Sequence, residues 1–247
     1  MTKSARAYVM SLALPEPVES EYESAPDFTS QQQAVAVGSQ LTEFTPAVST
    51  DARSAISNTL LLAQLAANKA ADQAADVFAW YGKYTQVLQG IGWQSQNLDF
   101  QTQSTVQQGL DVHKAIIPVI AAALGPAAAA ASIVLGVLNG LKDMNATSPW
   151  MTLFNRQSQH ASGAKFQVTY VDNDGTGQPQ LTLVCFAVTA QQALTQVLFF
   201  KFASQSVQLK QSTGKLGVTL DRLNVDRAAI AGRVDSFIAG NIQNIDI

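Results

Sequence analysis

Residues 115–141 read AIIPVIAAALGPAAAAASIVLGVLNGL and contain no charged side chain. A segment that is apolar on all sides must either be buried in protein or enter a lipid phase, so it limits the possible folds more than any other feature. Proline lacks a backbone N–H and restricts the residue before it. Pro118 should therefore kink a helix here, and Gly125-Pro126 should end it. We expect a helical hairpin with its tip at Gly125-Pro126 and a second arm from about 127 to 142.

Three ways of covering this hairpin remain open. It could be the permanent core of a helical bundle, or it could be packed in a soluble form and later released into a membrane. It could also be a constitutive membrane anchor. A bilayer core of about 30 Å requires about twenty apolar residues in one helix, and each arm is too short. Alanine is only marginally hydrophobic, which also disfavours the anchor.

A second periodic pattern begins at a helix start, Ser49-Thr50-Asp51. Spacings of four and three then continue through Ile56, Leu60, Ala63, Ala67, Ala70, Ala74, Val77, Tyr81, Tyr84, Leu88 and Ile91. This heptad pattern predicts one helix of about forty residues, roughly 60 Å long. The alanines in its centre would let a second helix approach closely.

The two ends of the chain have different characters. Residues 1–48 contain Pro15, Pro17, Pro26 and Pro46, half of the eight prolines, and predict an extended arm. Residues 148–247 alternate in AKFQVTYV and LTLVCFAV, which predicts a hairpin across DNDGTGQPQ. VLFFKFASQSVQL and KLGVTL predict a second hairpin across the turn QSTG. NVDRAAIAGRVDSFIAG then returns to helical spacing with Asn224 as a possible cap, and NIQNIDI could be a short strand or a tail.

These elements together predict an α+β fold. It consists of a long-helix bundle with a central hydrophobic helical hairpin, a small antiparallel β-sheet and a C-terminal helix. The expected divisions are 1–48 for the arm, 49–147 for the bundle and 148–247 for the β-hairpins with the last helix. We expect them to form one continuous structural unit, since the sheet would pack on the helices.

Composition and the absence of known motifs exclude several classes of function. Charged residues make up 13% of the chain and the net charge is −3, and the pI is near 5.3. No dense cluster of Lys or Arg is present, so binding of nucleic acid is not expected. The sequence lacks a phosphate loop, a dinucleotide fingerprint and the G-x-S-x-G and H-E-x-x-H motifs. We therefore expect no enzyme activity and no cofactor.

Few residues offer chemistry of their own. Asp172-Asn173-Asp174-Gly175 resembles a fragment of a calcium loop, but the distal Glu is missing, so a hairpin turn is the favoured interpretation and no metal site is expected. His113 lies on a helical seam just before the apolar hairpin, where it is either a structural histidine or a pH switch for release. His160 has no partner identifiable by spacing. Cys185 lies in an apolar run and should pack as a small hydrophobe.

The layout of a long heptad helix followed by an apolar hairpin resembles that of α-helical pore-forming toxins over about residues 50–145. The resemblance implies a soluble protein that forms a homo-oligomer on a target lipid membrane and permeabilises it; any receptor or partner protein is unknown. The inserting element would be 115–141. Its membrane-inserting residues would be Ile116, Ile117, Val119, Ile120, Leu124, Gly125, Pro126, Ile133, Val134, Leu135, Val137 and Leu138.

Two other functions remain open at this stage. In a self-assembling structural or interaction protein the hairpin would be permanent core, and the protein could be cytoplasmic. In a β-hairpin pore, VLFFKFASQSVQL would be the spanning element, although its alternation is interrupted at residues 198–200. Lys3 and Arg6 precede a short apolar run, but no small-x-small cleavage site follows. Release by lysis or by a dedicated secretion machine would fit a toxin.

Overall fold

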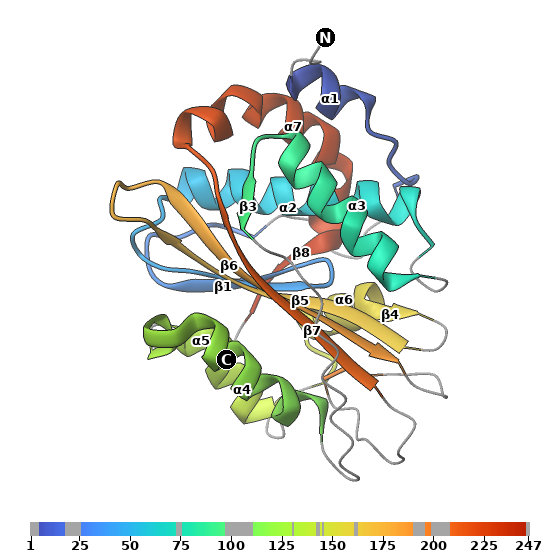
Figure 1. Ribbon diagram of the computed structural model, residues 1–247, viewed down its shortest axis with the longest axis vertical. Helices are drawn as coiled ribbons and strands as arrows, with labels where there is room; N and C mark the ends of the chain where they lie inside the picture. Colours follow the sequence, from blue (N-terminus) through green and yellow to red (C-terminus); the bar gives the residue numbers. More distant parts are fainter. Residues whose placement is uncertain are drawn as a thin grey trace.

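A mixed β-sheet lies at the centre of the protein, with helices on both of its faces (Figure 1). The computed structural model describes residues 5–17, 26–72, 76–96, 111–129, 131–141, 144, 146–160, 163–189, 196–198 and 208–245. The strand order is β3-β7-β6-β5-β2-β1-β8, and β4 pairs with β5. The strands are β1 (Gln33–Val37), β2 (Gln40–Phe44), β3 (Gln94–Gln96), β4 (Gln159–His160), β5 (Gly163–Asn173), β6 (Pro179–Thr189), β7 (Gln208–Gly217) and β8 (Ile242–Asn244).

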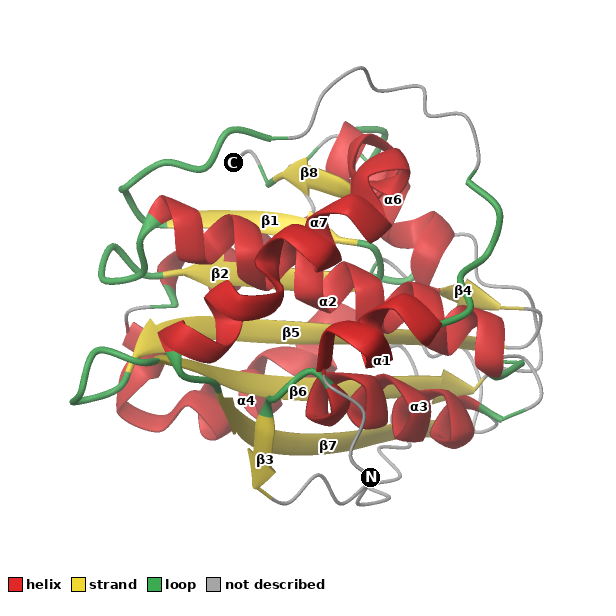
Figure 2. Cartoon of the chain, turned by 90° about the horizontal axis from the view of Figure 1, so that it is seen from above, coloured by secondary structure: helices red, strands yellow, loops and turns green. Residues whose placement is uncertain are grey.

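Two pairing relationships define this sheet, which is seen from above in Figure 2. The strands β5, β6 and β7 form a long antiparallel meander, in which Gly163 lies opposite Thr189 and Gln180 lies opposite Gly217. The hairpin of β1 and β2 joins this meander through β2, which runs parallel to β5 with Leu41 beside Val168. Residues from both ends of the chain are thereby joined in one sheet.

Burial explains why the sheet is central. The first nine residues of β5 and all five of β2 are buried, without the alternation of a sheet that faces water on one side. Strands that are buried on both faces require a cover on each. Val35, Val37 and Phe44 belong to one apolar core, whereas Ala34, Ala36 and Leu41 belong to a second one on the opposite face. The fold therefore has three layers.

The helices α1 (Ala5–Ser11), α2 (Thr50–Ala70), α3 (Val77–Gly90) and α7 (Leu220–Asn241) cover the first face. Helix α2 is buried over most of its length because it lies between the sheet and its neighbours α3 and α7. Ser49 and Thr219 cap α2 and α7 by accepting hydrogen bonds from the amides of Ala52 and Arg222. Val234 and Phe237 lie on the buried side of α7. Asn224, the possible cap predicted from the sequence, lies inside this helix, and Thr219 is the cap instead.

The second face is covered by α4 (Val112–Leu124), the 3-10 helix η1 (Gly125–Ala129), α5 (Ser132–Gly140) and α6 (Pro149–Ser158). Helix α4 contacts β6, and α5 contacts β1 and β2. We call residues 112–140 the α4–α5 layer. It lies below the sheet in Figure 1, on the side opposite α2, α3 and α7.

The predicted fold class is wrong. The sheet is central rather than small. The apolar stretch forms neither a long hairpin nor the centre of a helical bundle. It forms two short helices and a 3-10 turn on the outside of the sheet. The residues of α4 and α5 that pack inward meet strands, and not the heptad helix, because the sheet separates the two helical layers.

The forty-residue helix is also wrong, because the heptad pattern is divided between two helices. Helix α2 ends with Ala71 in an extended conformation. Helix α3 starts afresh at Asp76, whose side chain accepts hydrogen bonds from the amides of Phe78 and Ala79. The two helices pack against each other. Apolar spacing continues across the break because both helices bury one face in the same core.

The strands of the C-terminal half are partly as predicted. The hairpin of β5 and β6 confirms the two alternating segments, and β8 confirms the strand alternative for the end of the chain. The turn predicted at QSTG is wrong, because residues 211–214 lie inside β7 and pair with β6 over their whole length. That pairing outweighs the local turn preference of Ser and Gly. Residues 199–207 of the third predicted strand lie outside the described residues.

The predicted arm, residues 1–48, includes α1 and the hairpin of β1 and β2. The turn between these strands places Gly38 at φ +56°. A Cβ at this position would lie 2.5 Å from Oε1 of Gln64, so both the backbone and the available space favour glycine. Part of the expected arm therefore lies within the sheet.

Candidate functional site

The α4–α5 layer contains all twelve residues predicted to enter a membrane, and the structure separates them by burial. Six of them face the sheet and are buried: Ile116, Ile120, Leu124, Val134, Val137 and Leu138. Four are partly buried and pack at the edge of the same core: Ile117, Val119, Ile133 and Leu135. Gly125 and Pro126, the predicted tip, are exposed in η1. The structure thus brings the predicted residues together in one layer, and their insertion stays a prediction.

The outer surface of this layer carries no charge between residues 115 and 140. Among the residues of 115–140 whose burial is described, the exposed ones are Pro118, Ala122, Gly125, Pro126, Gly136 and Asn139. By contrast, α7 on the other side of the sheet carries Asp221, Arg222, Asp226, Arg227, Arg233 and Asp235. An uncharged, alanine-rich and glycine-rich surface loses little hydration energy when it leaves water, because it holds few strongly solvated groups.

A buried carboxylate lies beneath the layer. Glu43 on β2 is 1% exposed, and its two oxygens accept hydrogen bonds from the backbone amides of Ile133, at 3.2 Å, and Val134, at 2.9 Å. The side-chain amide of Gln32 donates to the same carboxylate. Sequence reasoning missed Glu43 because it placed residues 1–48 in an arm. Alternation with Leu41 in LTEF was the available signal, since it places a carboxylate on an apolar strand face.

His113 marks the start of the layer. The histidine is 4% exposed, and its Nδ1 lies 3.1 Å from the carbonyl oxygen of Leu198. Because a carbonyl can only accept, this contact requires the proton on Nδ1. The next residue, Lys114, is half exposed and pairs with Asp111 at 3.6 Å. The ring thus has the hydrogen bond of a structural histidine, and its role as a pH switch stays a prediction.

The helices of the layer are short. At 1.5 Å per residue, α4 with 13 residues and α5 with 9 extend roughly 20 Å and 14 Å. Across the described ranges, no helix combines the length and the apolar content needed to cross a bilayer. Helix α4 continues through Pro118 and ends at Leu124, as Gly125-Pro126 predicts.

The suspected calcium fragment is a hairpin turn. Oδ1 of Asp174 accepts hydrogen bonds from the amide of Thr176 at 2.8 Å, from its hydroxyl at 2.7 Å and from the amide of Gln178 at 3.0 Å. These bonds hold the pKa of Asp174 below its usual value. The carboxylate is thus engaged in closing the turn between β5 and β6.

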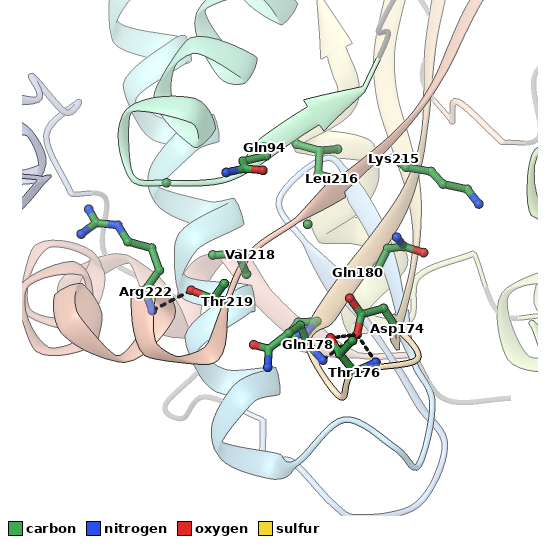
Figure 3. A pocket seen from close by; sticks show the side chains of 13 residues that line it. Gln94, Asp174, Thr176, Gln178, Gln180, Lys215, Leu216, Val218, Thr219 and Arg222 are labelled. Atoms are coloured by element: carbon green, nitrogen blue, oxygen red, sulfur yellow. Dashed lines mark hydrogen bonds between the residues drawn. The ribbon is translucent and has the colours of Figure 1, made fainter.

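A pocket of about 750 Å³ adjoins this turn. Figure 3 shows Asp174 and Thr176 at the bottom, Gln94 and Lys215 at the top, and Arg222 from the first turn of α7 at the left. Several of its groups are already satisfied within the chain: Gln178 accepts from the amide of Leu220 at 2.7 Å, and Arg222 binds Asp226 at 2.7 Å. No sequence signal indicates this pocket, because its walls come from four separate elements.

His160 and Cys185 lie outside the α4–α5 layer, on β4 and β6. Burial, followed by the charge of Lys165, lowers the pKa of His160, and neither ring nitrogen has a hydrogen-bond partner among the described residues. In the part of the chain that the structure describes, no group of three or more His, Cys, Asp or Glu side chains lies close enough together to bind a metal ion. Cys185 is buried on the α3 side of the sheet and packs as a small hydrophobe, as expected.

Comparison with known proteins gives weak structural similarities. No family model matches the chain, and no curated protein matches it. A delta-endotoxin structure is 16% identical with a TM-score of 0.37, covering 87% of this chain and 96% of its own. The activated Cyt2Ba monomer from Bacillus thuringiensis subsp. israelensis is 15% identical with a TM-score of 0.40, covering 74% of this chain and 97% of its own. The Evf virulence factor is 15% identical with a TM-score of 0.37, covering 99% and 92%. The chain thus weakly resembles proteins described as toxins or virulence factors, and at these values the similarity carries no argument about function.

Proposed function

We propose that this protein is a non-catalytic, membrane-permeabilising protein whose α4–α5 layer leaves the sheet and enters a target bilayer. The observation that carries this proposal is a helical layer that is uncharged from residue 115 to 140, on one face of a sheet whose other face is covered by helices that include the charged α7. The apolar residues of α4 and α5 are covered by the sheet in the soluble form. Entry into lipid would replace one apolar surrounding by another.

The length of the helices decides what kind of insertion is proposed. Neither α4 nor α5 can cross a hydrocarbon core of about 30 Å. We therefore expect the layer to lie in the bilayer interface with η1 as its leading edge, because Gly125 and Pro126 are exposed there. Permeabilisation then requires several copies acting together. The homo-oligomer and the target membrane are parts of the proposal, as is release of the protein from the cell that makes it.

Leakage of dye from vesicles tests this proposal. Gly136 is exposed on α5, and a Cβ there would meet no atom within 4 Å, so Gly136→Asp adds a charge without disturbing the core. An Asp costs about 3 kcal/mol at the centre of a membrane-spanning helix and less at the interface, where the layer would lie. We expect Gly136→Asp to reduce leakage by about tenfold and Gly136→Ala to preserve it.

Gly232→Asp is the matched control, because Gly232 is an exposed helical glycine on α7 with the same open surroundings. It should cause the same release of dye as the wild type. Vesicles of phosphatidylcholine alone and with phosphatidylserine separate apolar insertion from charge attraction. An absence of leakage by the wild type on both, or equal leakage by the two Asp variants, would overturn the proposal and favour an assembly protein with α4–α5 as permanent core.

A further inference from the structure

Helix α5 lacks the local residues that normally begin a helix. Its N-cap is Ala131, which provides no side-chain hydrogen bond, and the first turn contains no acidic residue. The first amides of any helix need acceptors, which a Ser, Thr, Asp or Asn at the N-cap usually supplies. A helix of 9 residues is also too short to be stable alone in water. Helix α5 therefore depends on its surroundings for its start.

Glu43 supplies what the local sequence lacks. It is distant in sequence and lies on β2, and each oxygen of its carboxylate takes one first-turn amide, from Ile133 and Val134. The negative charge also faces the positive end of the α5 dipole. Bonds between a carboxylate and backbone amides are among the stronger hydrogen bonds in proteins.

The surroundings of Glu43 on its face of the sheet are largely apolar. On the same face of the sheet lie Ala34, Leu41 and Tyr170, all part of the apolar core under the layer. Burial, the charge of Asp172 and the charge of Glu43 together raise the pKa of Tyr170, in that order of importance. A charged group in such a place is costly unless it is hydrogen-bonded, and the amides of Ile133 and Val134 supply these bonds.

We infer that Glu43 is a latch, which holds the α4–α5 layer on the sheet in the soluble form and must be released before the layer can leave. This inference rests on the proposed membrane function and names the contact that controls it. When the latch opens, Glu43 stays with the sheet and reaches water, while the apolar residues of α5 become free to enter lipid. The carboxylate of the latch thus stays on β2 and does not enter the bilayer with the layer.

Glu43→Gln tests the latch, because glutamine keeps the size of the side chain but has one oxygen and no charge. One of the two amides then loses its acceptor. Hydrogen exchange by mass spectrometry should show amides of residues 131–141 exchanging about ten to a hundred times faster in the variant. Amides of α7 should exchange as in the wild type.

Gln64→Leu is the control for a general loss of stability. Gln64 is buried on the opposite face of the sheet, where its amide group donates to the carbonyl of Val37 at 2.8 Å and its oxygen accepts from the amide of Ser39 at 3.0 Å. It does not touch α5, so its effect on exchange should not be concentrated in residues 131–141. Vesicle leakage is measured on the same three proteins.

Selective opening of 131–141 together with faster leakage in Glu43→Gln supports both the latch and the membrane function. Selective opening with no leakage from any of the three proteins supports the latch as a structural device and overturns the membrane function. Equal exchange of 131–141 in the wild type and Glu43→Gln overturns the latch, whatever the leakage. Selective opening of the same residues in Gln64→Leu would also overturn it.

Discussion

The ammonium nitrogen of Lys165 lies 3.7 Å from the centre of the Trp80 ring and 3.1 Å from the hydroxyl oxygen of Ser39, between the sheet and α3. The lysine is 1% exposed, and burial lowers its pKa to about 7. The contacts shown for its nitrogen are a hydroxyl and a ring face, and neither carries a full negative charge. When it is charged, the lysine is therefore stabilised only by the polarity of these neighbours.

Lys165 should make stability depend on pH. Its pKa is about 7 in the folded protein and 10.5 when unperturbed, so the unfolded chain binds more protons between these values. The free energy of unfolding should rise with pH in this window, and the cost of the charge is fully present below pH 7. Between pH 7 and 9.5 the rise should reach at most about 3 kcal/mol.

Denaturant unfolding of the wild type and Lys165→Met checks this dependence. Methionine removes the charge and nearly keeps the volume, so the variant should lose this rise and gain stability relative to the wild type toward pH 6. Lys83→Met, at an exposed position on α3, serves as the control and should keep the wild-type slope. Parallel pH curves for wild type and Lys165→Met would contradict the assignment.

Arg53 should be among the most sensitive positions of the protein. It is 0% exposed on α2, and its guanidinium donates to the carbonyl oxygens of Val48 at 2.9 Å and Thr45 at 2.7 Å. Its charge also lies 5.8 Å from the centre of the Phe44 ring. Arg53→Met leaves buried carbonyls without donors, and we expect a loss of about 3 to 5 kcal/mol in the free energy of unfolding.

The control is Arg227→Met, which removes a pair formed with the exposed Asp51 at 3.1 Å. It should change stability little, since exposed pairs contribute little. Thermal unfolding measures both variants. If Arg53→Met unfolds at the temperature of the wild type, the buried guanidinium does not organise the loop between β2 and α2.

Two glycine-to-alanine substitutions should have opposite signs. Gly38→Ala places a Cβ at φ +56° and 2.5 Å from the Gln64 oxygen, so it should destabilise by about 1 to 3 kcal/mol. Gly82→Ala lies in α3 with open space around it and should stabilise by about 0.5 to 1 kcal/mol through helix propensity. Denaturant midpoints measure both effects. Equal signs would show that the turn of β1 and β2 adapts to a side chain.

Local features were predictable from the sequence. The hairpin of β5 and β6 follows from alternation that a short turn connects, and the end of α4 follows from the chemistry of Gly125-Pro126. Asp76 also carried a readable cap signal, which the continuing heptad spacing obscured. Such features depend on neighbours in sequence, so composition and spacing are sufficient to find them.

The central sheet was not predictable in the same way. It depends on β2 pairing with β5, which places Leu41 beside Val168 although about half of the chain lies between them. The strands β1 and β2 are buried on both faces, so their sequence QAVAVGSQLTEF lacks a clear amphipathic period. The partner of Glu43 was hidden for a similar reason, because the contact joins residues that are distant in sequence.

Adjacent residues on β6 can report which helical layer opens. Val184 belongs to the core under the α4–α5 layer, whereas Cys185 belongs to the core under α2 and α3. Both are buried, and burial raises the pKa of the Cys185 thiol, so it should resist thiol reagents in the native protein. Two proteins thus report on the two faces of one strand. The wild type carries a thiol at residue 185, and the double variant Val184→Cys, Cys185→Ala carries it at residue 184.

If the α4–α5 layer leaves on membranes, added vesicles should speed the labelling of residue 184 about tenfold or more and leave Cys185 protected, because α3 still covers it. Labelling is followed by mass spectrometry, and denatured protein gives the full extent for both chains. Protection of both residues on vesicles would show that the layer stays closed. The two side chains point to opposite faces of the same strand. Faster labelling of Cys185 alone would therefore show that α3 opens and the α4–α5 layer does not, which would contradict the proposal.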